Sequence, residues 1–352
     1  MKGESVYILG PCSAESREQV LRTAGQICDL RSQIDDFKFI FRAGVWKPRT
    51  SPHTFQGAGE EGLAWLQEVQ RRYHVPVATE VATPEHVVEA LQAGIDYLWI
   101  GARSSANPIV VQSIADTISN FKFQISFDRQ SRANLKGLFI KNPVNADADL
   151  WLGNIERLEK TGLPVGVIHR GCGHQPCWSM AHTVRTRRPD IPMLLDPSHM
   201  SGDASQVPNL LRKLSELGLD GAMIEVHCCP EEALSDKKQQ IQPSVISGQL
   251  SAIRKLNTEN SKLNTIELNW LRAEIDELDD RLWDTILARM EVSERIGVWK
   301  QAHGVAPLQP ERYQQIVQQR LQWAQSHGIE ANSVQQIFDA IHHESLKKQA
   351  YQ

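Results

Sequence analysis

Four side chains that ligate transition metals occur in the first two thirds of the sequence. They are a thiol, an imidazole and two carboxylates, at Cys12, His199, Glu225 and Asp236. This mixture of soft and hard ligands suits Mn²⁺, Fe²⁺, Co²⁺ or Zn²⁺ better than Ca²⁺ or Mg²⁺. Each group follows a different predicted strand or lies in a different loop, so only a fold that gathers strand ends could bring the four together.

Basic side chains recur in the same region. One loop holds Lys47, Arg49 and Thr50, and Pro48 and Pro52 stiffen it. Further cations follow other predicted strands, at Arg42, Arg103, Lys141 and Arg170. Cations gathered without an anion would repel one another, so we interpret them as a clamp for one polyanionic substrate or two phosphorylated ones. The alternative interpretation of the loop is a solvated basic segment.

Eight short apolar stretches are predicted to be the strands that position these groups, at residues 6–10, 37–41, 75–79, 97–101, 137–140, 165–168, 192–195 and 221–224. Amphipathic stretches of helical length follow them, at 16–30, 60–73, 84–93, 108–119, 147–161, 178–187, 204–217 and 244–256. This alternation predicts an α/β fold, a (β/α)8 TIM barrel. The polar groups would lie at the C-terminal ends of its strands, where the active sites of such barrels are found. Glu80 joins that set after the third strand, and residues 121–136 are predicted to be an insertion.

Length and composition exclude several classes of protein. A chain of 352 residues is long enough for two domains, and its formal net charge of −4 argues against a nucleic-acid-binding protein. No apolar run is long enough to span a membrane, and the polar start lacks a signal-peptide pattern. The six cysteines suggest reduced thiols in a cytoplasmic enzyme rather than a disulfide framework. Cys172, His174 and Cys177 match no common zinc pattern, and the pair Cys228 and Cys229 is predicted to serve packing.

The pattern changes after residue 256. Residues 257–265 are polar and aperiodic, which predicts a linker between a domain at 1–256 and a second at 266–352. From Leu268 to Trp299 apolar residues recur every three or four positions, which predicts a helix over 266–303 roughly 55 Å long. Two shorter helices are predicted at 310–326 and 333–349. A domain of this size cannot bury the apolar face of so long a helix by itself. We therefore expect an intertwined dimer of three-helix domains.

Polar side chains interrupt the apolar face of this all-α domain. They are Arg272, Arg289, Lys300, Arg312, Ser345 and Gln349. Together they would line a cavity with four cations, which suits a dicarboxylate ligand. For any one of them taken alone, a solvated helix face is the simpler interpretation.

The barrel resembles the type I-beta 3-deoxy-D-arabino-heptulosonate 7-phosphate (DAHP) synthases. The resemblance lies in motifs that cover nearly all of residues 1–256: GPCSAES at 10–16, KPRTSP at 47–52, ATE at 78–80, IGAR at 100–103, DPSH at 196–199 and ALSD at 233–236. The related 3-deoxy-octulosonate 8-phosphate synthases usually have Lys-Ala-Asn-Arg in place of Lys-Pro-Arg-Thr, so the motif favours erythrose 4-phosphate over arabinose 5-phosphate. No ferredoxin-like regulatory domain is expected before the first strand.

The helical domain resembles the all-helical chorismate mutases, because its six polar positions fall at that family's spacings. Two positions differ. Gln309 stands where an Asp is usual, and Tyr313 stands where a Glu commonly follows the arginine. A domain that serves only dimerisation and regulation is therefore an open alternative.

For the barrel, the resemblance implies condensation of phosphoenolpyruvate with D-erythrose 4-phosphate, the entry to the shikimate pathway. Mn²⁺, or Fe²⁺, Co²⁺ or Zn²⁺, would bind the four metal ligands and polarise the aldehyde. Phosphoenolpyruvate would be held by Lys47, Arg103, Lys141 and Arg170 with Arg42, near Glu80, and the aldose phosphate by Arg49 and Thr50. Lys47 is also expected to donate a proton, because neighbouring cations would lower its pKa. A 3-deoxy-octulosonate 8-phosphate synthase is the alternative.

For the helical domain, the resemblance implies the Claisen rearrangement of chorismate to prephenate. Lys300 and Gln349 would stabilise the charge on the breaking ether oxygen. Arg289 and Arg272 of the partner subunit would hold the two carboxylates, with Arg312 and Ser345 completing the site. Chorismate or prephenate bound there is expected to inhibit the synthase.

Overall fold

The computed structural model describes residues 5–30, 38–47, 53–125, 135–246, 248 and 263–350. The chain divides into two compact units, Met1–Glu274 and Ile275–Gln352. Residues 257–262 of the predicted linker lie outside the described part, whereas residues 263–265 belong to a helix. The boundaries drawn from the sequence at 256 and 266 stay a prediction.

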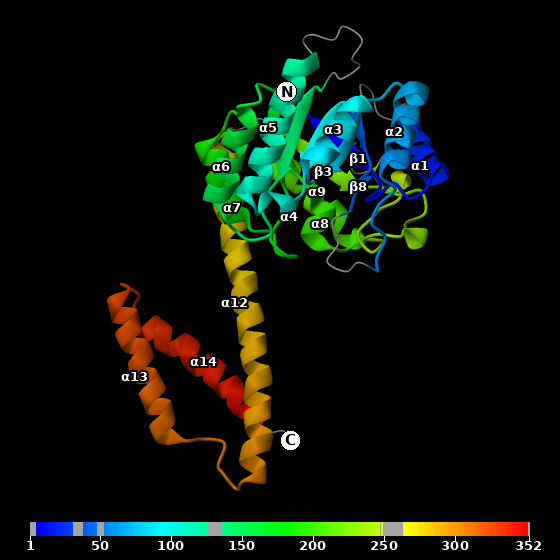
Figure 1. Cartoon of the computed structure of the whole chain (residues 1–352). Coiled ribbons are helices and arrows are strands. Elements are labelled where there is room, and N and C mark those ends of the chain that lie inside the picture. Colours follow the sequence, from blue (N-terminus) through cyan, green and yellow to red (C-terminus); the bar gives the residue numbers. More distant parts are fainter. Residues whose placement is uncertain are drawn as a thin grey trace. The chain divides into compact units, whose positions relative to one another are not determined.

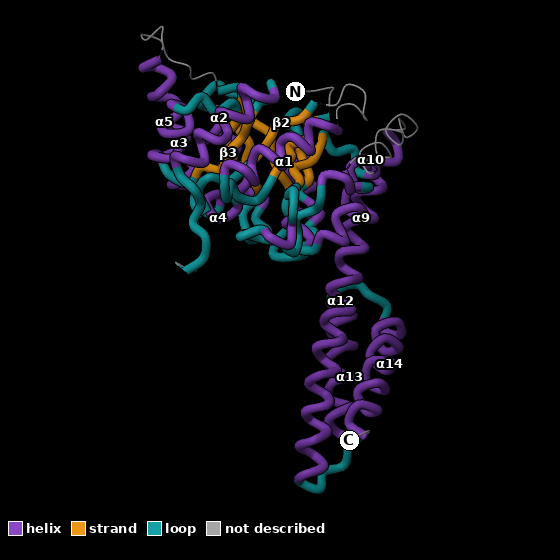
Figure 2. Tube along the Cα trace, turned by 90° about the vertical axis from the view of Figure 1, so that its right-hand side faces the viewer, coloured by secondary structure: helices purple, strands orange, loops and turns teal. Residues whose placement is uncertain are grey.

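The first unit is a closed barrel of parallel strands in which each strand pairs with the next along the chain and β8 closes onto β1 (Figure 1). Figure 2 shows the strands enclosed by helices. The (β/α)8 barrel predicted from the sequence is confirmed. Its strands are β1 (Val6–Gly10), β2 (Phe39–Arg42), β3 (Val77–Val81), β4 (Tyr97–Ile100), β5 (Gly137–Lys141), β6 (Val165–His169), β7 (Met193–Leu195) and β8 (Gly221–Glu225).

Helices cover the outside of the barrel, and polar side chains cap several of them. Ser16, Thr83 and Asp147 accept hydrogen bonds from backbone N–H groups three residues later and so satisfy otherwise unpaired donors. The main helices are α1 (Arg17–Asp29), α2 (Glu60–Tyr73), α3 (Pro84–Gln92), α5 (Pro108–Ile125), α6 (Ala148–Glu159) and α7 (Trp178–Arg187).

Three predicted segments differ from the structure or lie outside it. α5 continues to Ile125, so the predicted insertion begins as helix, and residues 126–134 lie outside the described part. The helix predicted over 204–217 is divided into η2 (Ala204–Gln206), α9 (Val207–Leu211) and α10 (Lys213–Glu216). Pro208 lacks the N–H that a helix continuous with η2 would need, and a second break falls at Arg212. Most of the helix predicted over 244–256 lies outside the described residues.

The barrel has an inner and an outer apolar layer. The inner layer takes one residue from each strand: Ile8, Ile40, Ala78, Trp99, Phe139, Ile168, Leu194 and Met223. The outer layer packs the strands against the helices. The interior is therefore filled by side chains, and a functional site must lie at one end of the barrel.

The long helix α12 (Leu263–Ala302) begins in the first unit and ends in the second. Trp270 anchors its start, because the indole is 1 % exposed and its Nε1 donates to the carbonyl of Leu217 at 3.1 Å. The ring also stacks on His182 of α7 at 5.3 Å between centroids. The sequence periodicity did not reveal that the first turns of α12 pack on the barrel.

The second unit holds the rest of α12 with α13 (Pro310–Ser326) and α14 (Ala331–Ala350), close to the predicted helices (Figure 1). α12 and α14 approach closely at Gly297, where an added Cβ would lie 2.8 Å from the Cα of Gln349. Large apolar side chains on α12 are left exposed, among them Ile275, Leu278, Leu282, Leu287 and Trp299. No helix in the described part of the chain is long and apolar enough to cross a membrane.

Candidate active sites

The two-residue period of the strands places a charged layer directly above the inner apolar layer. Residues two positions after the apolar ones also face the barrel axis. They are Gly10, Arg42, Glu80, Gly101, Lys141, Arg170, Asp196 and Glu225. Arg42, Glu80, Lys141 and Glu225 therefore lie within strands, where sequence analysis placed them just after strand ends.

Two glycines in this layer make room for their neighbours. A Cβ on Gly101 would lie 2.0 Å from the Oε1 atom of Glu80, and one on Gly10 would lie 2.0 Å from the carbonyl oxygen of Arg42. Gly10 also has a φ of 149°, in the region that favours glycine. Position 10 therefore requires glycine, whereas a side chain at position 101 would displace the Glu80 carboxylate.

Three of the predicted metal ligands converge. The sulfur of Cys12 and a carboxylate oxygen from each of Glu225 and Asp236 lie within 4.8 Å of one another. Cys12 Sγ is 3.0 Å from Asp236 Oδ2, and Asp236 adopts a left-handed backbone with a φ of 47°. The Nε2 atom of His199 faces the same group, 3.7 Å from Glu225 Oε1. The described residues thus include a possible metal site.

Asp196 orients His199. Its Oδ2 atom lies 2.9 Å from Nδ1 of His199 and accepts a hydrogen bond from Lys141 Nζ at 2.6 Å. Because Asp196 occupies Nδ1, Nε2 is left to face a metal, as in other carboxylate–histidine pairs. Burial raises the pKa of Asp196, but His199 and Lys141 hold it well below its usual value. In the sequence Asp196 stands out only as part of the DPSH motif, and this role was not predicted.

Glu225 is held by three polar neighbours. Arg42 Nη2 donates to its Oε1 at 3.2 Å, Gln239 Nε2 donates to its Oε2 at 2.8 Å, and its backbone N–H donates to Ser198. Burial raises the pKa of Glu225, but His199, Arg42 and Lys47 lower it overall. The carboxylate therefore stays ionised and ready to ligate a cation.

Arg42 is almost completely buried, with its guanidinium 4.7 Å above the ring of Trp99. Its Nη2 atom binds Glu225 and the carbonyl of Cys12, whereas Nε and Nη1 find no hydrogen-bond partner among the described residues. Buried donors without partners are costly, so these two atoms indicate an anion or water in the functional site.

The environment of Lys47 differs from the one expected from the sequence, and this changes the direction of its pKa shift. Its Nζ atom lies 3.1 Å from Cys12 Sγ. Burial lowers the pKa of Lys47, but Cys12, Glu80 and Glu225 raise it above its usual value. The lowered pKa predicted from the sequence is therefore wrong, because the nearby cations are adjacent in the sequence, whereas the anions come from distant strands.

Burial also raises the pKa of Cys12, to about 12, and Glu225 and Asp236 raise it further while Lys47 and Arg42 oppose them. A divalent cation would supply the positive charge that a buried thiolate between two carboxylates needs. The donor set therefore fits a metal of the kind expected from the sequence.

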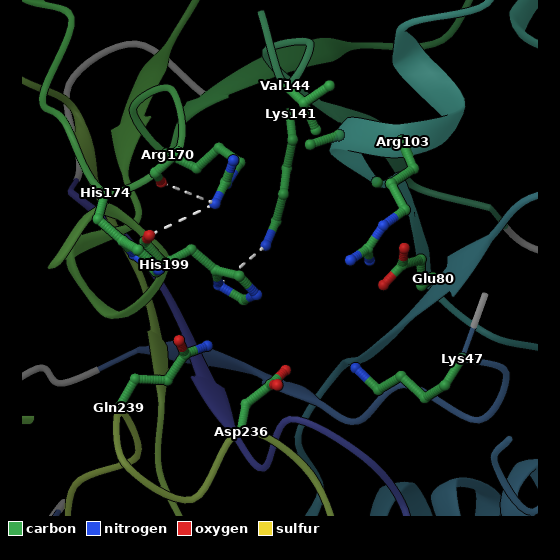
Figure 3. Close-up of a pocket in the computed structure, with 13 residues that line it drawn as sticks. Lys47, Glu80, Arg103, Lys141, Val144, Arg170, His174, His199, Asp236 and Gln239 are labelled. Atoms are coloured by element: carbon green, nitrogen blue, oxygen red, sulfur yellow. Dashed lines mark hydrogen bonds between the residues drawn. The ribbon is translucent and has the colours of Figure 1, made fainter. Parts of the chain in front are cut away.

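A cavity of about 290 Å³ opens beside this group (Figure 3). Lys47, Arg103, Lys141 and Arg170 line it with Glu80 and Asp236, so cations outnumber carboxylates. Arg170 Nη2 donates to the carbonyls of Gly173 and His199, each at 3.4 Å. Such a cavity is suited to small polyanions.

The structure adds residues to the site and leaves others outside it. Val144, His174 and Gln239 also line the cavity, and Asn142 accepts a hydrogen bond from the Arg170 backbone at 2.7 Å. Asp196 and Gln239 could have been found by the two-residue alternation and by their closeness to the DPSH and ALSD motifs. The predicted aldose-phosphate residues Arg49 and Thr50 lie outside the described residues.

In the second unit, four of the predicted residues form two pairs between α12 and α14. Arg289 donates a short hydrogen bond to Ser345, which is 2 % exposed. Lys300 Nζ donates to Gln349 Oε1 at 3.0 Å. Burial lowers the pKa of Lys300 and, with Arg320, that of Arg289.

The other predicted mutase residues are not part of these pairs. Arg312 is exposed on α13, and Arg272 belongs to the first unit. Tyr313, one of the two departures from the mutase pattern, donates a short hydrogen bond to Asp339 and packs on His342. That contact holds α13 against α14.

Two family models divide the chain between them. Residues 2–262 match the DAHP synthetase I family, and residues 271–350 match chorismate mutase type II. Relatives of the barrel include the phospho-2-dehydro-3-deoxyheptonate aldolase of Thermotoga maritima, 27 % identical over 267 residues, which are 72 % of this chain and 70 % of that protein. The 2-dehydro-3-deoxyphosphooctonate aldolase of Desulfatibacillum aliphaticivorans is 28 % identical over 276 residues, 71 % of this chain and 92 % of that protein.

Solved structures that resemble the barrel include DAHP synthases. The crystal structure of the Thermotoga maritima DAHP synthase is 28 % identical, with a TM-score of 0.61 over 73 % of this chain and 71 % of that one. A truncated form of the Thermotoga maritima enzyme is 25 % identical, with a TM-score of 0.58 over 73 % of this chain and 88 % of that one. Because the first family model covers the whole barrel, the chain belongs to the DAHP synthetase I family, and it carries a chorismate mutase type II region at residues 271–350.

Proposed function

We propose that the barrel condenses phosphoenolpyruvate with D-erythrose 4-phosphate to DAHP and phosphate, and that the helical region rearranges chorismate to prephenate. The observation that carries the first activity is the cavity in which Lys47, Arg103, Lys141 and Arg170 adjoin the set of Cys12, His199, Glu225 and Asp236. Two phosphorylated substrates need several cations, and an aldehyde that accepts a carbon nucleophile needs an electrophilic catalyst.

The metal would be held by Cys12, His199, Glu225 and Asp236, and we propose Mn²⁺ for these mixed ligands, with Fe²⁺, Co²⁺ and Zn²⁺ as alternatives. A divalent ion there would serve as a Lewis acid for the aldehyde oxygen of erythrose 4-phosphate. Gln239 and Arg42 hold Glu225 in place, and Asp196 holds His199.

The cations of the cavity bind and orient phosphoenolpyruvate. Arg103, Lys141 and Arg170 would surround its phosphate and carboxylate. The two Arg42 donors without a partner among the described residues would bind the same anion. With its raised pKa, Lys47 stays cationic at neutral pH and contributes charge to substrate binding. Glu80 orients groups at that end of the cavity, and Arg49 and Thr50 bind the aldose phosphate. Carbon 3 of the enolpyruvate is thereby presented to the aldehyde carbon of the second substrate.

The barrel assignment is tested by following phosphoenolpyruvate loss with erythrose 4-phosphate or arabinose 5-phosphate. We expect turnover with the first aldose, loss of most activity in Cys12→Ala and His199→Ala, and recovery of chelated wild type on adding Mn²⁺. Full activity in excess EDTA would contradict the metal assignment. Faster turnover of arabinose 5-phosphate would favour a 3-deoxy-octulosonate 8-phosphate synthase.

The mutase activity is supported by the pairs Arg289–Ser345 and Lys300–Gln349 on facing helices. Lys300 and Gln349 would stabilise the charge that develops on the ether oxygen of chorismate, which requires no covalent catalysis. Arg289, Arg312 and Arg272 of the partner subunit would bind its two carboxylates. In the full chain, Gln349→Ala should mainly lower kcat. Chorismate binding without turnover in the wild type would favour the dimerisation and regulatory module instead.

We further propose that chorismate or prephenate bound in the helical region inhibits the synthase. The coupling free energy should be on the order of 1–3 kcal/mol, and phosphoenolpyruvate should weaken prephenate binding by the same factor. Prephenate is titrated into wild type and Arg289→Ala while phosphoenolpyruvate loss is followed. Weaker inhibition of the variant is expected, whereas equal inhibition would mean that prephenate acts in the barrel.

A further inference from the structure

A second pocket lies outside the active-site cavity, between α1 and the segment that follows β8. Its volume is about 340 Å³, and it is lined by Glu15, Ser16, Glu18, Gln19, Arg22, His227, Cys228, Glu232 and Leu234. Cys228 also lines a neighbouring pocket of about 290 Å³. Cys228 was predicted from the sequence to serve packing, but this half-buried residue lines two pockets.

The polar groups around the thiol are arranged for reactivity. Thr23 Oγ1 accepts a hydrogen bond from the Cys228 backbone N–H, which fixes the position of the residue. The Nδ1 atom of His227 accepts a hydrogen bond from the backbone of Cys229 at 3.0 Å, which fixes the ring beside the thiol. The Nε2 atom of His227 is buried and finds no hydrogen-bond partner among the described residues, with Glu15 Oε2 3.7 Å away.

Cys228 differs from the other thiols nearby. Partial burial raises the pKa of Cys228, but the neighbouring His227 and Thr23 side chains lower it overall. The pKa of Cys229 is raised by desolvation despite its place one residue away, and that of the buried Cys12 is raised to about 12. The thiolate is the reacting form, so Cys228 should react first among these three.

The pocket is acidic at its rim. Three glutamates line it, against two basic side chains, Arg22 and His227, so carboxylates are in excess. A reagent with positive charge is therefore attracted to the thiol and one with negative charge is repelled.

We infer that Cys228 is a modification site that forms mixed disulfides with small cationic disulfides. The Cys228 thiolate attacks one sulfur of the reagent, a bond forms between the two sulfurs, and the original disulfide bond breaks. The other half of the reagent leaves as a thiolate and takes a proton from water. The sulfur of Cys228 is oxidised, and the leaving sulfur is reduced.

The wall of this pocket also connects two metal ligands. Glu15 Oε1 accepts hydrogen bonds from the Leu234 backbone at 2.9 Å and from Ser13 Oγ at 3.2 Å, and Ser13 is in close hydroxyl contact with Ser235. Ser13 follows Cys12, and Ser235 precedes Asp236. Glu15 and Cys228 line the same pocket. We therefore expect a group attached to Cys228 to shift Glu15, alter the spacing of Cys12 and Asp236, and weaken metal binding.

The site is tested on the full chain with cystamine and with dithiodiglycolate, two small disulfides of opposite charge. Wild type, Cys228→Ser and Cys229→Ser are reacted, and the modified cysteine is identified by peptide mass spectrometry. We expect cystamine to modify Cys228 first, about tenfold faster than dithiodiglycolate at low salt, with the ratio falling as salt is added. Cys229→Ser should behave as wild type. Preferential labelling of another cysteine, or equal rates for both reagents, would overturn the proposal.

The link to the metal site has its own readout. After removal of free cystamine, Mn²⁺ affinity is measured by competition with a chelator. We expect a severalfold weaker affinity that dithiothreitol restores, and no change in similarly treated Cys228→Ser. An unchanged affinity in modified wild type would overturn the link between this pocket and the metal ligands.

Discussion

At the level of single residues, the site depends on a charged layer that lies two positions beyond an apolar one. Ile168 and Arg170 face the same axis, as do Leu194 and Asp196. The apolar residue fills the barrel, and the charged one reaches its open end. Four of these charges are then fixed in ion pairs, Lys141 with Asp196 and Arg42 with Glu225.

Replacing Asp196 by Asn tests how far a supporting residue controls metal binding. The amide cannot hold both His199 and Lys141 as the carboxylate does, so His199 loses its orientation. We expect Mn²⁺ affinity to fall about 10–100-fold, as for other ligand-supporting carboxylates. Asp203→Asn is a matched control, because Asp203 caps a short helix at the surface. Equal affinities in the two variants would show that Asp196 does not orient the ligand.

His169 should make the barrel sensitive to acid. It is fully buried between Trp151 and Trp178, and burial lowers its pKa to about 4 from 6.5. Between those values the unfolded chain binds a proton that the folded chain does not, so stability falls as pH decreases through this range. The loss should be about 2–3 kcal/mol between pH 6.5 and 4.5.

The check is chemical denaturation of wild type and His169→Phe at both pH values, followed by tryptophan fluorescence. The variant keeps an aromatic ring but cannot titrate, so it should lose less stability on acidification. The same pH dependence in both proteins would rule out His169 as the source.

At the level of elements, α12 has two different functions along its length. Its first turns pack on the barrel through Trp270 and through His182, whose Nδ1 lies 2.5 Å from Glu274. Its later turns provide Arg289 and Lys300 to the second unit. One continuous helix therefore takes part in both folded units.

Trp270→Ala should release the first turns of α12 from the barrel. The variant loses the packing of a fully buried indole, which costs about 3–5 kcal/mol for large aromatic residues. We expect faster hydrogen exchange in residues 265–274. Trp283→Ala is the matched control, because that indole on the same helix is 66 % exposed. If Trp270→Ala leaves exchange in this segment unchanged, the anchor assignment is wrong.

At the level of the whole molecule, the second unit exposes an apolar stripe on α12. Ile275 and Leu278 are each 58 % exposed, and Leu287 is 62 % exposed. Contiguous apolar surface of this kind marks an interface with another protein. A second copy of the same helix, as we propose, would cover the stripe and supply Arg272 to the mutase site.

Leu278→Lys should therefore dissociate the dimer and lower chorismate turnover. A charge placed within an apolar interface must be desolvated without a partner, which is costly. Sedimentation velocity gives the mass, with Leu308→Lys as a control because Leu308 lies outside α12. A monomeric wild type, or a variant that remains a dimer with full mutase activity, would contradict this prediction.

The sequence alone determined the order and type of most elements. Alternating buried strands and amphipathic helices predict a barrel, and a three-to-four-residue repeat predicts the long helix α12, because periodicity is a local property of the chain. The motifs also determined most residues of the candidate site, since each lies near the end of a strand and a barrel gathers those ends.

Only the tertiary structure decided which of these charges meet. Burial and Arg42 lower the pKa of Lys47, but Cys12, Glu80 and Glu225 raise it above its usual value. The role of Asp196 in orienting the metal ligand His199 depends on its contacts with His199 and Lys141. The docking of Trp270 joins α12 to a carbonyl 53 positions earlier in the chain. Electrostatic and packing energies depend on distances between atoms, and residues far apart in sequence acquire those distances only when the chain folds.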